Sequence, residues 1–328
     1  MKIAVVGCGA VGSYYGAKLC RAGQDVAFLL RSDYEAVRRN GVRVLSPDGN
    51  FQAQPRCARR PEEIGPVDLV LIGLKTTAND QFEDLLPPLV GKSTAVLTLQ
   101  NGLGNEEALA RLFPPEQILG GLCFVCLNRI EPGVIRHMEY GSIVIGEFQG
   151  SPQPRTHDIA SRFRNAGVVC KVSDNLAQMH WEKLVWNVPF NGLGVAGLAG
   201  YEAFQTSSNP ASSPRSVTAN APTLTTDKLL EDPRWEPLVL ELMLEVIRAG
   251  NALGYSIPEN LADRQIERTR TMGAYKASTL IDFEQGRPLE LESLFSEPLR
   301  RAKSAGVQVP RLERLCGILQ ELGGRQAQ

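Results

Sequence analysis

The feature that most constrains the fold is a group of glycines close to the amino terminus. The segment Gly7-Cys8-Gly9-Ala10-Val11-Gly12 is a complete G-x-G-x-x-G pattern, and it directly follows the short apolar run Lys2–Val6. An amphipathic stretch, Ser13–Ala22, comes next. A strand, this glycine pattern and a helix, in that order, form the context in which the pattern indicates a dinucleotide-binding turn.

Each glycine in such a turn has its own physical role. Gly7 permits the tight turn, Gly9 lets the backbone approach a pyrophosphate, and Gly12 lets the helix and the strand pack closely. The unpaired amides and the dipole at the start of the helix attract the phosphate charge. The sequence therefore predicts a coenzyme-binding segment made of Gly7, Cys8, Gly9, Ala10, Val11 and Gly12.

The first half of the chain alternates apolar runs with helical segments, which predicts a parallel sheet covered on both faces. The expected strands are Lys2–Val6, Asp25–Leu30, Val67–Leu74, Thr94–Leu99 and Ile118–Cys126, and the expected helices include Ser13–Ala22 and Asn79–Leu89. A hairpin is expected at Gly41–Cys57, turned by Pro47-Asp48-Gly49-Asn50. A second antiparallel section, Gly133–Phe148, precedes an expected helix at Arg155–Asn165.

Strand signals stop after about Asp174, and the remainder is predicted to be helical. The expected helices are Asn175–Val188, Trp235–Leu253, Glu259–Thr271, a stretch after Tyr275, Leu291–Ala305 and Arg311–Leu322, with Gly254, Gly306 and Gly323 as helix ends. The polar segment Gln205–Ala221 is expected to be a mobile loop or an insertion. We therefore predict an α/β protein with an N-terminal Rossmann-type domain, residues 1–173, followed by an all-helical C-terminal domain, residues 174–328, that binds substrate.

Composition argues against several classes of protein. The chain has 35 lysines and arginines against 36 aspartates and glutamates and contains no long basic run, so we expect neither nucleic acid nor a membrane surface as a partner. The first apolar run is too short for a signal peptide, and a cytoplasmic location is expected. The seven scattered cysteines are expected to be reduced thiols, with a metal or redox role for Cys123 and Cys126 as a minor alternative. His137, His157 and His180 lie far apart, so we expect no metal site.

The residues after the second expected strand favour a phosphorylated coenzyme. An NAD enzyme typically places an acidic residue there to bind the ribose hydroxyls, whereas this chain has Arg31 and Ser32. A guanidinium suits a 2′-phosphate, so we expect NADP, in its reduced form NADPH. Asp33 lies two residues further on and keeps NAD as an alternative. Arg31 as an ordinary solvated residue at a strand end also remains open.

Polar segments follow two further expected strands. Lys75-Thr76-Thr77 comes after Val67–Leu74, and Gln100-Asn101-Gly102-Leu103-Gly104 comes after Thr94–Leu99. Ligands of such sheets bind beyond the carboxyl ends of the strands, so both segments are expected to face the coenzyme. Strand ends are often polar for structural reasons alone, and the residues by themselves leave that alternative open.

The segment Trp181–Gly192 carries an unusual polar set. Lys183, Asn187 and Asn191 recur at every fourth position, so they share one face of a helix that continues to Pro189 or just past it. Their neighbours are two tryptophans and several aliphatic residues. A lysine flanked by amides in such surroundings is either a surface residue with a buried stem or a catalytic group, and the residues alone leave both open.

These motifs resemble those of the ketopantoate reductase (2-dehydropantoate 2-reductase) family over nearly the whole chain. The resemblance rests on the glycine pattern, Arg31, Leu74-Lys75-Thr76, Gln100-Asn101-Gly102, Trp181–Asn191, and the stretch from Ser278 through Asp282 and Gly286-Arg287 to Glu290. It implies a Rossmann domain followed by a helical domain, with the active site in the cleft between them. It also implies the NADPH-dependent reduction of a small 2-oxo acid, most typically ketopantoate to pantoate, in pantothenate and coenzyme A biosynthesis.

The resemblance also assigns roles to single residues. Lys183 matches the proton donor, which also binds substrate, and Asn187 and Asn191 match substrate-binding amides. Ser278 matches a contact of the substrate carboxylate, and Glu290 a residue that closes the cleft near the coenzyme. Lys75 and Asn101 match coenzyme contacts, with Asn101 also touching substrate.

The chain departs from the family pattern at Leu289 and Ser296, where a threonine and a glycine are common, which leaves the substrate's identity open. An opine-type or other 2-hydroxyacid dehydrogenase of the same architecture is the first alternative. A non-catalytic NADPH-binding sensor is the second. The sequence does not decide whether the protein is a homodimer.

Overall fold

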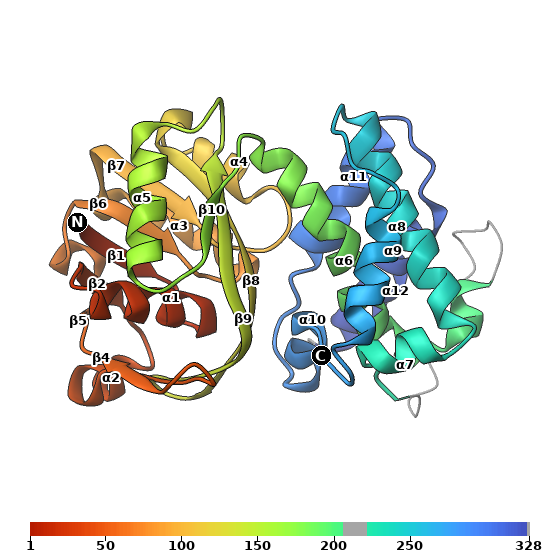
Figure 1. Ribbon diagram of the computed structural model, residues 1–328, viewed down its shortest axis with the longest axis horizontal. Coiled ribbons are helices and arrows are strands. Elements are labelled where there is room, and N and C mark those ends of the chain that lie inside the picture. Colours follow the sequence, from red (N-terminus) through yellow and green to blue (C-terminus); the bar gives the residue numbers. More distant parts are fainter. Residues whose placement is uncertain (206–221, 327–328) are drawn as a thin grey trace. The chain divides into compact units, whose positions relative to one another are not determined.

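The computed structural model describes residues 1–205 and 222–326, and the chain divides into two compact units, Met1–Ala177 and Gln178–Gln328 (Figure 1). In the described residues, every strand lies in the first unit and the second unit is built of helices. The predicted order of an α/β domain followed by a helical domain is therefore confirmed. None of the described helices is both long enough and apolar enough to cross a membrane.

The first unit is built on one sheet of ten strands in the part of the chain that is described. Six of its strands run parallel in the spatial order β5-β2-β1-β6-β7-β8. These are β1 (Lys2–Val6), β2 (Asp25–Leu29), β5 (Arg56–Ala58), β6 (Val67–Ile72), β7 (Val90–Thr98) and β8 (Ile118–Glu131). The chain lays β2 on one side of β1 and β6 on the other, so the strand order reverses there. In open parallel sheets, ligands bind beyond the carboxyl ends of the strands at this point of reversal.

The other four strands extend the sheet from β8. They are β9 (Val134–Glu147), antiparallel to β8, then β3 (Val42–Leu45) beside β9, β4 (Phe51–Ala53) at the edge, and β10 (Cys170–Val172), which also pairs with β9. The predicted hairpin is confirmed for β3 and β4. The last part of that prediction was wrong, because Cys57 lies in β5 and pairs with β2 in parallel. This pairing covers the backbone of β2, which would otherwise be an open edge.

Both faces of the parallel sheet are covered, as β1 shows most directly. Ile3 and Val5 belong to one buried apolar cluster, and Ala4 and Val6 belong to a second cluster on the other face. This alternation follows from the two-residue period of a strand. The helices of this unit are α1 (Ala10–Arg21), α2 (Tyr34–Asn40), α3 (Phe82–Leu85), α4 (Asn105–Ala110) and α5 (Pro154–Asn165).

The helical stretch expected at Asn79–Leu89 is present as short helical turns and not as one continuous helix. The chain there forms 3-10 turns, Thr76–Gln81 and Pro87–Leu89, on either side of the single helical turn α3. Prolines lack a backbone N–H, and the residue before a proline is disfavoured in helical geometry. Pro87 and Pro88 therefore stop the helix one turn after it begins.

The second unit contains most of the predicted helices with shifted ends. They are α6 (Leu176–Ala196), α7 (Thr226–Glu231), α8 (Trp235–Ala252), α9 (Leu261–Arg270), α10 (Ser278–Glu284), α11 (Glu297–Ser304) and α12 (Pro310–Gln326). Gly254 and Gly306 follow helix ends in left-handed geometry, but Gly323 lies inside α12, so that predicted end was wrong. A π-helical turn, Glu292–Ser296, precedes α11. The predicted loop at Gln205–Ala221 lies, apart from its first residue, outside the described residues.

The helix α6 is longer than predicted, because it passes through Pro189 and ends only at Ala196. A proline inside a helix removes one backbone hydrogen bond. The whole of residues 187–197 is buried, so tertiary packing outweighs that loss. As a consequence, residues on either side of Pro189 belong to one continuous helix.

Candidate active site

The turn after β1 requires glycine at two of its three pattern positions. Gly7 has a φ of +91°, and a Cβ placed on it would lie 2.2 Å from the backbone nitrogen of Leu74. A Cβ on Gly12 would lie 2.2 Å from the carbonyl oxygen of Gly7. Both contacts are with backbone, which cannot move aside as a flexible side chain would. The protein's own packing therefore explains these two glycines.

Gly9 differs, because nothing in the protein explains it. A Cβ there would have no neighbour within 4 Å, and its φ of −74° is accessible to any residue. Gly9 is the N-cap of α1, where the first backbone N–H groups of a helix have no partner within the helix. An open space beside unpaired amides at a helix start fits a bound phosphate group.

Two further residues, Cys8 in the turn and Gly73 beside it, contribute to the packing of this segment. The thiol of Cys8 donates to the carbonyl oxygen of Leu29 at 3.4 Å, and burial raises the pKa of this thiol, which keeps it neutral. Gly73, directly after β6, is a position that the sequence analysis missed. A Cβ on Gly73 would lie 2.8 Å from the Cα of Gly12, so glycines on both sides allow this close approach. The only signal in the sequence is a glycine directly after a buried strand.

The end of β2 presents one charged side chain outward and holds another inward. Arg31 is exposed, and its guanidinium makes no hydrogen bond or ion pair with the described residues. The side chain of Asp33 is only 6% exposed and accepts a hydrogen bond from Nη1 of Arg129 at 2.5 Å. Burial acts to raise the pKa of Asp33, but hydrogen bonds from Arg129, Ser32 and the Gly133 amide outweigh it and lower the pKa.

The polar segments after β6 and β7 are joined by a chain of amide hydrogen bonds. Gln100 donates to Asn79 at 2.7 Å, and Asn79 donates to Asn105 at 3.0 Å. Asn105 in turn donates to the backbone oxygen of Asn101 at 3.1 Å. The network holds the half-buried Asn101 in place and connects its loop to the turn that begins after Lys75. The sequence analysis missed Asn79 and Asn105, and no motif in the sequence marks them.

In the second unit, α6 places Lys183, Asn187 and Asn191 at successive turns of one helix. Asn191 is 2% exposed, and its Oδ1 accepts hydrogen bonds from the hydroxyl of Ser278 at 3.1 Å and from the amide of Thr279 at 3.0 Å. The structure thus brings together two predicted site residues that are 87 positions apart. Because Oδ1 is occupied, the Nδ2 group is the part of Asn191 that can donate to a ligand.

Asn187 is 7% exposed, and its amide makes no hydrogen bond with the described residues. No buried side-chain nitrogen or oxygen of the described residues lacks a hydrogen-bond partner, so the polar atoms of the Asn187 amide remain accessible and can bind a ligand. Lys183 is half-buried one turn earlier on α6, and Glu290, two residues before the π-helical turn, is 5% exposed. The arrangement offers a cationic donor and neutral amides, which suits an anionic substrate that carries hydroxyl groups.

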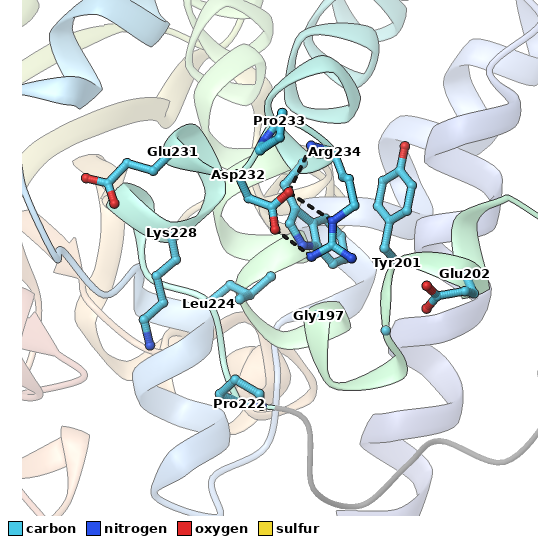
Figure 2. Close-up of a pocket in the computed structure, with 12 residues that line it drawn as sticks. Gly197, Tyr201, Glu202, Pro222, Leu224, Lys228, Glu231, Asp232, Pro233 and Arg234 are labelled. Carbon is cyan, nitrogen blue, oxygen red and sulfur yellow. Dashed lines mark hydrogen bonds and ion pairs between the residues drawn. The ribbon is translucent and has the colours of Figure 1, made fainter.

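A hollow of about 760 Å³ lies elsewhere in the second unit (Figure 2). Figure 2 shows Arg234 on its wall, next to Tyr201, with its guanidinium held by both carboxylate oxygens of Asp232 at 3.0 and 2.6 Å. That ion pair neutralises the arginine, and none of the predicted substrate-binding residues lines the hollow. In the described ranges, no group of three or more His, Cys, Asp or Glu side chains is placed to hold a metal ion.

Comparison with known proteins covers both units. The family described as "Ketopantoate reductase PanE/ApbA" matches residues 3–150, and the family described as its C-terminal part matches residues 209–323. A 2-dehydropantoate 2-reductase of Nostoc sp. is 38% identical over 99% of this chain and 96% of its own length. The crystal structure of a 2-dehydropantoate 2-reductase from Geobacter metallireducens GS-15 is 45% identical, with a TM-score of 0.88 over 98% of this chain and 99% of that one.

The fold is also shared with a more distant protein. The structure of a D-mandelate dehydrogenase with NADH and anilino(oxo)acetate has a TM-score of 0.84 over 100% of this chain and 99% of that one. Its sequence is only 19% identical, so this similarity extends to the fold alone.

Proposed function

The chain belongs to the ketopantoate reductase family, and on this premise we propose that it reduces ketopantoate to pantoate with NADPH. The observation that carries the proposal is the polar face of α6. Lys183, Asn187 and Asn191 supply a cation and amide donors on one face of the helix. Asn187 makes no hydrogen bond with the described residues, and Ser278 and Thr279 orient Asn191. Such a set suits a small 2-oxo acid with a distal hydroxyl group.

We propose that the coenzyme is a nicotinamide dinucleotide, bound by the first unit and specifically NADPH. The space beside Gly9 and the amides at the start of α1 fit the pyrophosphate. The exposed guanidinium of Arg31 fits the 2′-phosphate. Lys75, Asn101 and Glu290 are assigned further coenzyme contacts by the family pattern. When bound, NADPH supplies the hydride for the reduction.

The residues of this chain then have defined tasks in the reaction. Ser278 and Asn101 orient the substrate carboxylate, and Asn187 and Asn191 bind the distal hydroxyl, with Asn191 donating through Nδ2. The ammonium of Lys183 donates a hydrogen bond to the ketone oxygen, stabilises the negative charge that builds on it, and transfers a proton to it. Glu290 is assigned to hold Lys183 in place or to contact the nicotinamide ribose.

The test is the oxidation of NADPH by the purified protein with a panel of 2-oxo acids, each assayed with and without an amine. We expect turnover with ketopantoate to exceed turnover with pyruvate and oxaloacetate clearly. Preference for another acid would contradict the assignment of the substrate, and a requirement for an amine would indicate an opine-type dehydrogenase. NADPH binding without turnover on any acid would indicate a sensor rather than an enzyme.

A further inference from the structure

The turn after β2 contains both features by which Rossmann proteins distinguish coenzymes. A carboxylate near this position accepts hydrogen bonds from the ribose hydroxyls of NAD, and an arginine accommodates the 2′-phosphate of NADP. This chain has Arg31 and Asp33 only two residues apart. An outward-facing carboxylate beside the arginine would repel the phosphate and pair with the guanidinium. The coenzyme preference therefore depends on where the Asp33 side chain is held.

Asp33 is held by the end of β8 and the turn that follows it, far away in the sequence. Arg129, near the end of β8, donates to Oδ1 at 2.5 Å across a separation of 96 residues. The backbone amide of Gly133 donates to Oδ2 at 3.2 Å. Asp33 also precedes α2, but its side chain makes no capping hydrogen bond to that helix. The hydroxyl of Ser32 also donates to Oδ1, at 3.0 Å. Both carboxylate oxygens are thus occupied, and among the described residues that donate to them only Arg129 is charged.

We propose that Arg129 is a positioning residue that sets the coenzyme preference by holding Asp33 away from the ribose of the bound coenzyme. The inference deepens the proposed function and rests on it, because it takes the end of β2 to be the site of the ribose. Arg129 is 42% exposed along its side chain whereas Asp33 is 6% exposed, so the ion pair draws a carboxylate inward. Without the guanidinium, the lowest-cost arrangement for this charge is to turn toward water.

A carboxylate that turns outward changes the binding of the two coenzymes in opposite directions. It repels the 2′-phosphate of NADPH and competes for Arg31, which weakens NADPH binding. It also accepts hydrogen bonds from the ribose hydroxyls of NADH, which strengthens NADH binding. Removing Arg129 should therefore lower the ratio of the NADH to the NADPH dissociation constant by tenfold or more.

The test measures the dissociation constants of NADPH and NADH by calorimetry on the full chain, so it does not depend on turnover. The variants are Arg129→Ala, Asp33→Asn and the double variant. Arg136→Ala is the matched control, because Arg136 is an exposed arginine on β9 of the same hairpin with no partner among the described residues. Arg129→Lys keeps a charge within reach of Asp33. Arg129→Gln replaces the alanine variant if that variant does not fold.

We expect Arg129→Ala to lower the ratio at least tenfold, and Arg136→Ala and Arg129→Lys to change it less than threefold. We expect the double variant to match Asp33→Asn, because without a carboxylate there is nothing to hold back. An unchanged ratio in a folded Arg129→Ala protein would overturn the proposal. The proposal would also be overturned if the double variant lowered the ratio as much as Arg129→Ala does, since Arg129 would then act without Asp33.

The proposed function fails separately from this inference. A wild-type protein that binds coenzyme but reduces no 2-oxo acid contradicts the proposed function and leaves the ratio measurable. A wild-type protein that binds neither coenzyme overturns both.

Discussion

The glycine turn after β1 and the polar face of α6 are both candidate binding surfaces, but they differ in what accounts for their residues. In the turn, Gly7 and Gly12 are needed because any Cβ would meet backbone atoms. On α6, Asn187 is 7% exposed, and its amide, whose polar atoms remain accessible, makes no hydrogen bond with the described residues. The turn serves the fold and the ligand through the same backbone, whereas α6 also carries Asn187, whose amide makes no hydrogen bond with the described residues.

This difference determines how substitutions should act. A side chain at Gly7 or Gly12 would displace backbone atoms, so it should appear first as lost stability, whereas a Cβ at Gly9 meets nothing within 4 Å. On the polar face of α6, removing the side chain of Asn187 breaks no hydrogen bond with the described residues, so it should appear as lost function. Removing that of Asn191 also breaks the hydrogen bonds with Ser278 and Thr279.

The largest effect is expected for Lys183→Ala. If Lys183 donates the proton, its removal should lower kcat by about 10²–10⁴-fold, which is the usual contribution of a general acid. The thermal midpoint and the NADPH dissociation constant should change little, because the side chain is only half-buried. Steady-state kinetics, calorimetry and thermal unfolding measure the three quantities. Lys228→Ala, at an exposed lysine on α7, is the control and should retain full kcat.

A kcat within a fewfold of the wild type in Lys183→Ala would contradict the proton-donor role. A large loss of stability would instead make Lys183 a structural residue and would weaken the comparison between the two surfaces.

The second prediction separates Gly7 from Gly9 within one turn. Gly7→Ala places a Cβ 2.2 Å from a backbone nitrogen at a positive φ, so the free energy of unfolding should fall by about 3 kcal/mol or more. Gly9→Ala meets nothing within 4 Å, so its unfolding free energy should stay within about 0.5 kcal/mol of the wild type. Its NADPH affinity should fall about tenfold or more, because the added methyl occupies the space of the pyrophosphate. Urea unfolding and calorimetry measure both.

If Gly9→Ala bound NADPH as the wild type does, the pyrophosphate would not approach this residue. Equal destabilisation by both substitutions would show that the turn tolerates no side chain at either position, whatever binds there.

The elements that the sequence predicts well are those defined by local pattern. The bounds of β1 are as predicted, because the apolar run Lys2–Val6 is closed by a glycine that must turn. The end of α6 was missed, because Pro189 is a local stop signal that burial of the surrounding residues overrides. Local rules describe the chain until long-range packing outweighs them.

The residues of the candidate site likewise fall into those that the sequence shows and those that depend on long-range packing. The glycine pattern and the spacing of Lys183, Asn187 and Asn191 are visible in the sequence, because each is formed by residues close together along the chain. The hydrogen bonds of Asn79 and Asn105 depend on how two loops meet, and no local pattern encodes them. The contact between Asp33 and the β8–β9 turn likewise depends on the register of distant strands.

The third prediction compares two asparagines on one helix face. Asn191→Ala leaves the Thr279 amide without its acceptor, so the unfolding free energy should fall by about 1–2 kcal/mol. Asn187→Ala breaks no hydrogen bond with the described residues and should leave stability within about 0.5 kcal/mol. Both substitutions should raise KM for ketopantoate, because each removes a contact with the substrate. A marked loss of stability in Asn187→Ala would mean that the protein itself uses this amide.

The smallest effect concerns pH and contrasts one buried carboxylate in each unit. Glu245 on α8 is 2% exposed and accepts the backbone amides of Arg311 at 2.9 Å and Leu312 at 2.8 Å, at the start of α12. Burial raises the pKa of Glu245 despite these hydrogen bonds, whereas the pKa of Asp33 is lowered. The folded protein therefore binds the Glu245 proton more tightly than the unfolded chain does, and releases the Asp33 proton more readily.

The two carboxylates should give pH dependences of opposite sign. Stability from Glu245 should fall as pH rises from its unfolded pKa of about 4.3 to the higher folded value and then stay level. Stability from Asp33 should be complete above about pH 3.9 and fall as pH drops through the lower folded value. Urea unfolding across this range should show a shallower decline with rising pH in Glu245→Gln, by less than about 1 kcal/mol in total. The substitution also removes an acceptor, which lowers stability equally at every pH, so the slope is the readout. If the unfolding free energy of Glu245→Gln depended on pH as that of the wild type does, Glu245 would not have a raised pKa in the folded protein.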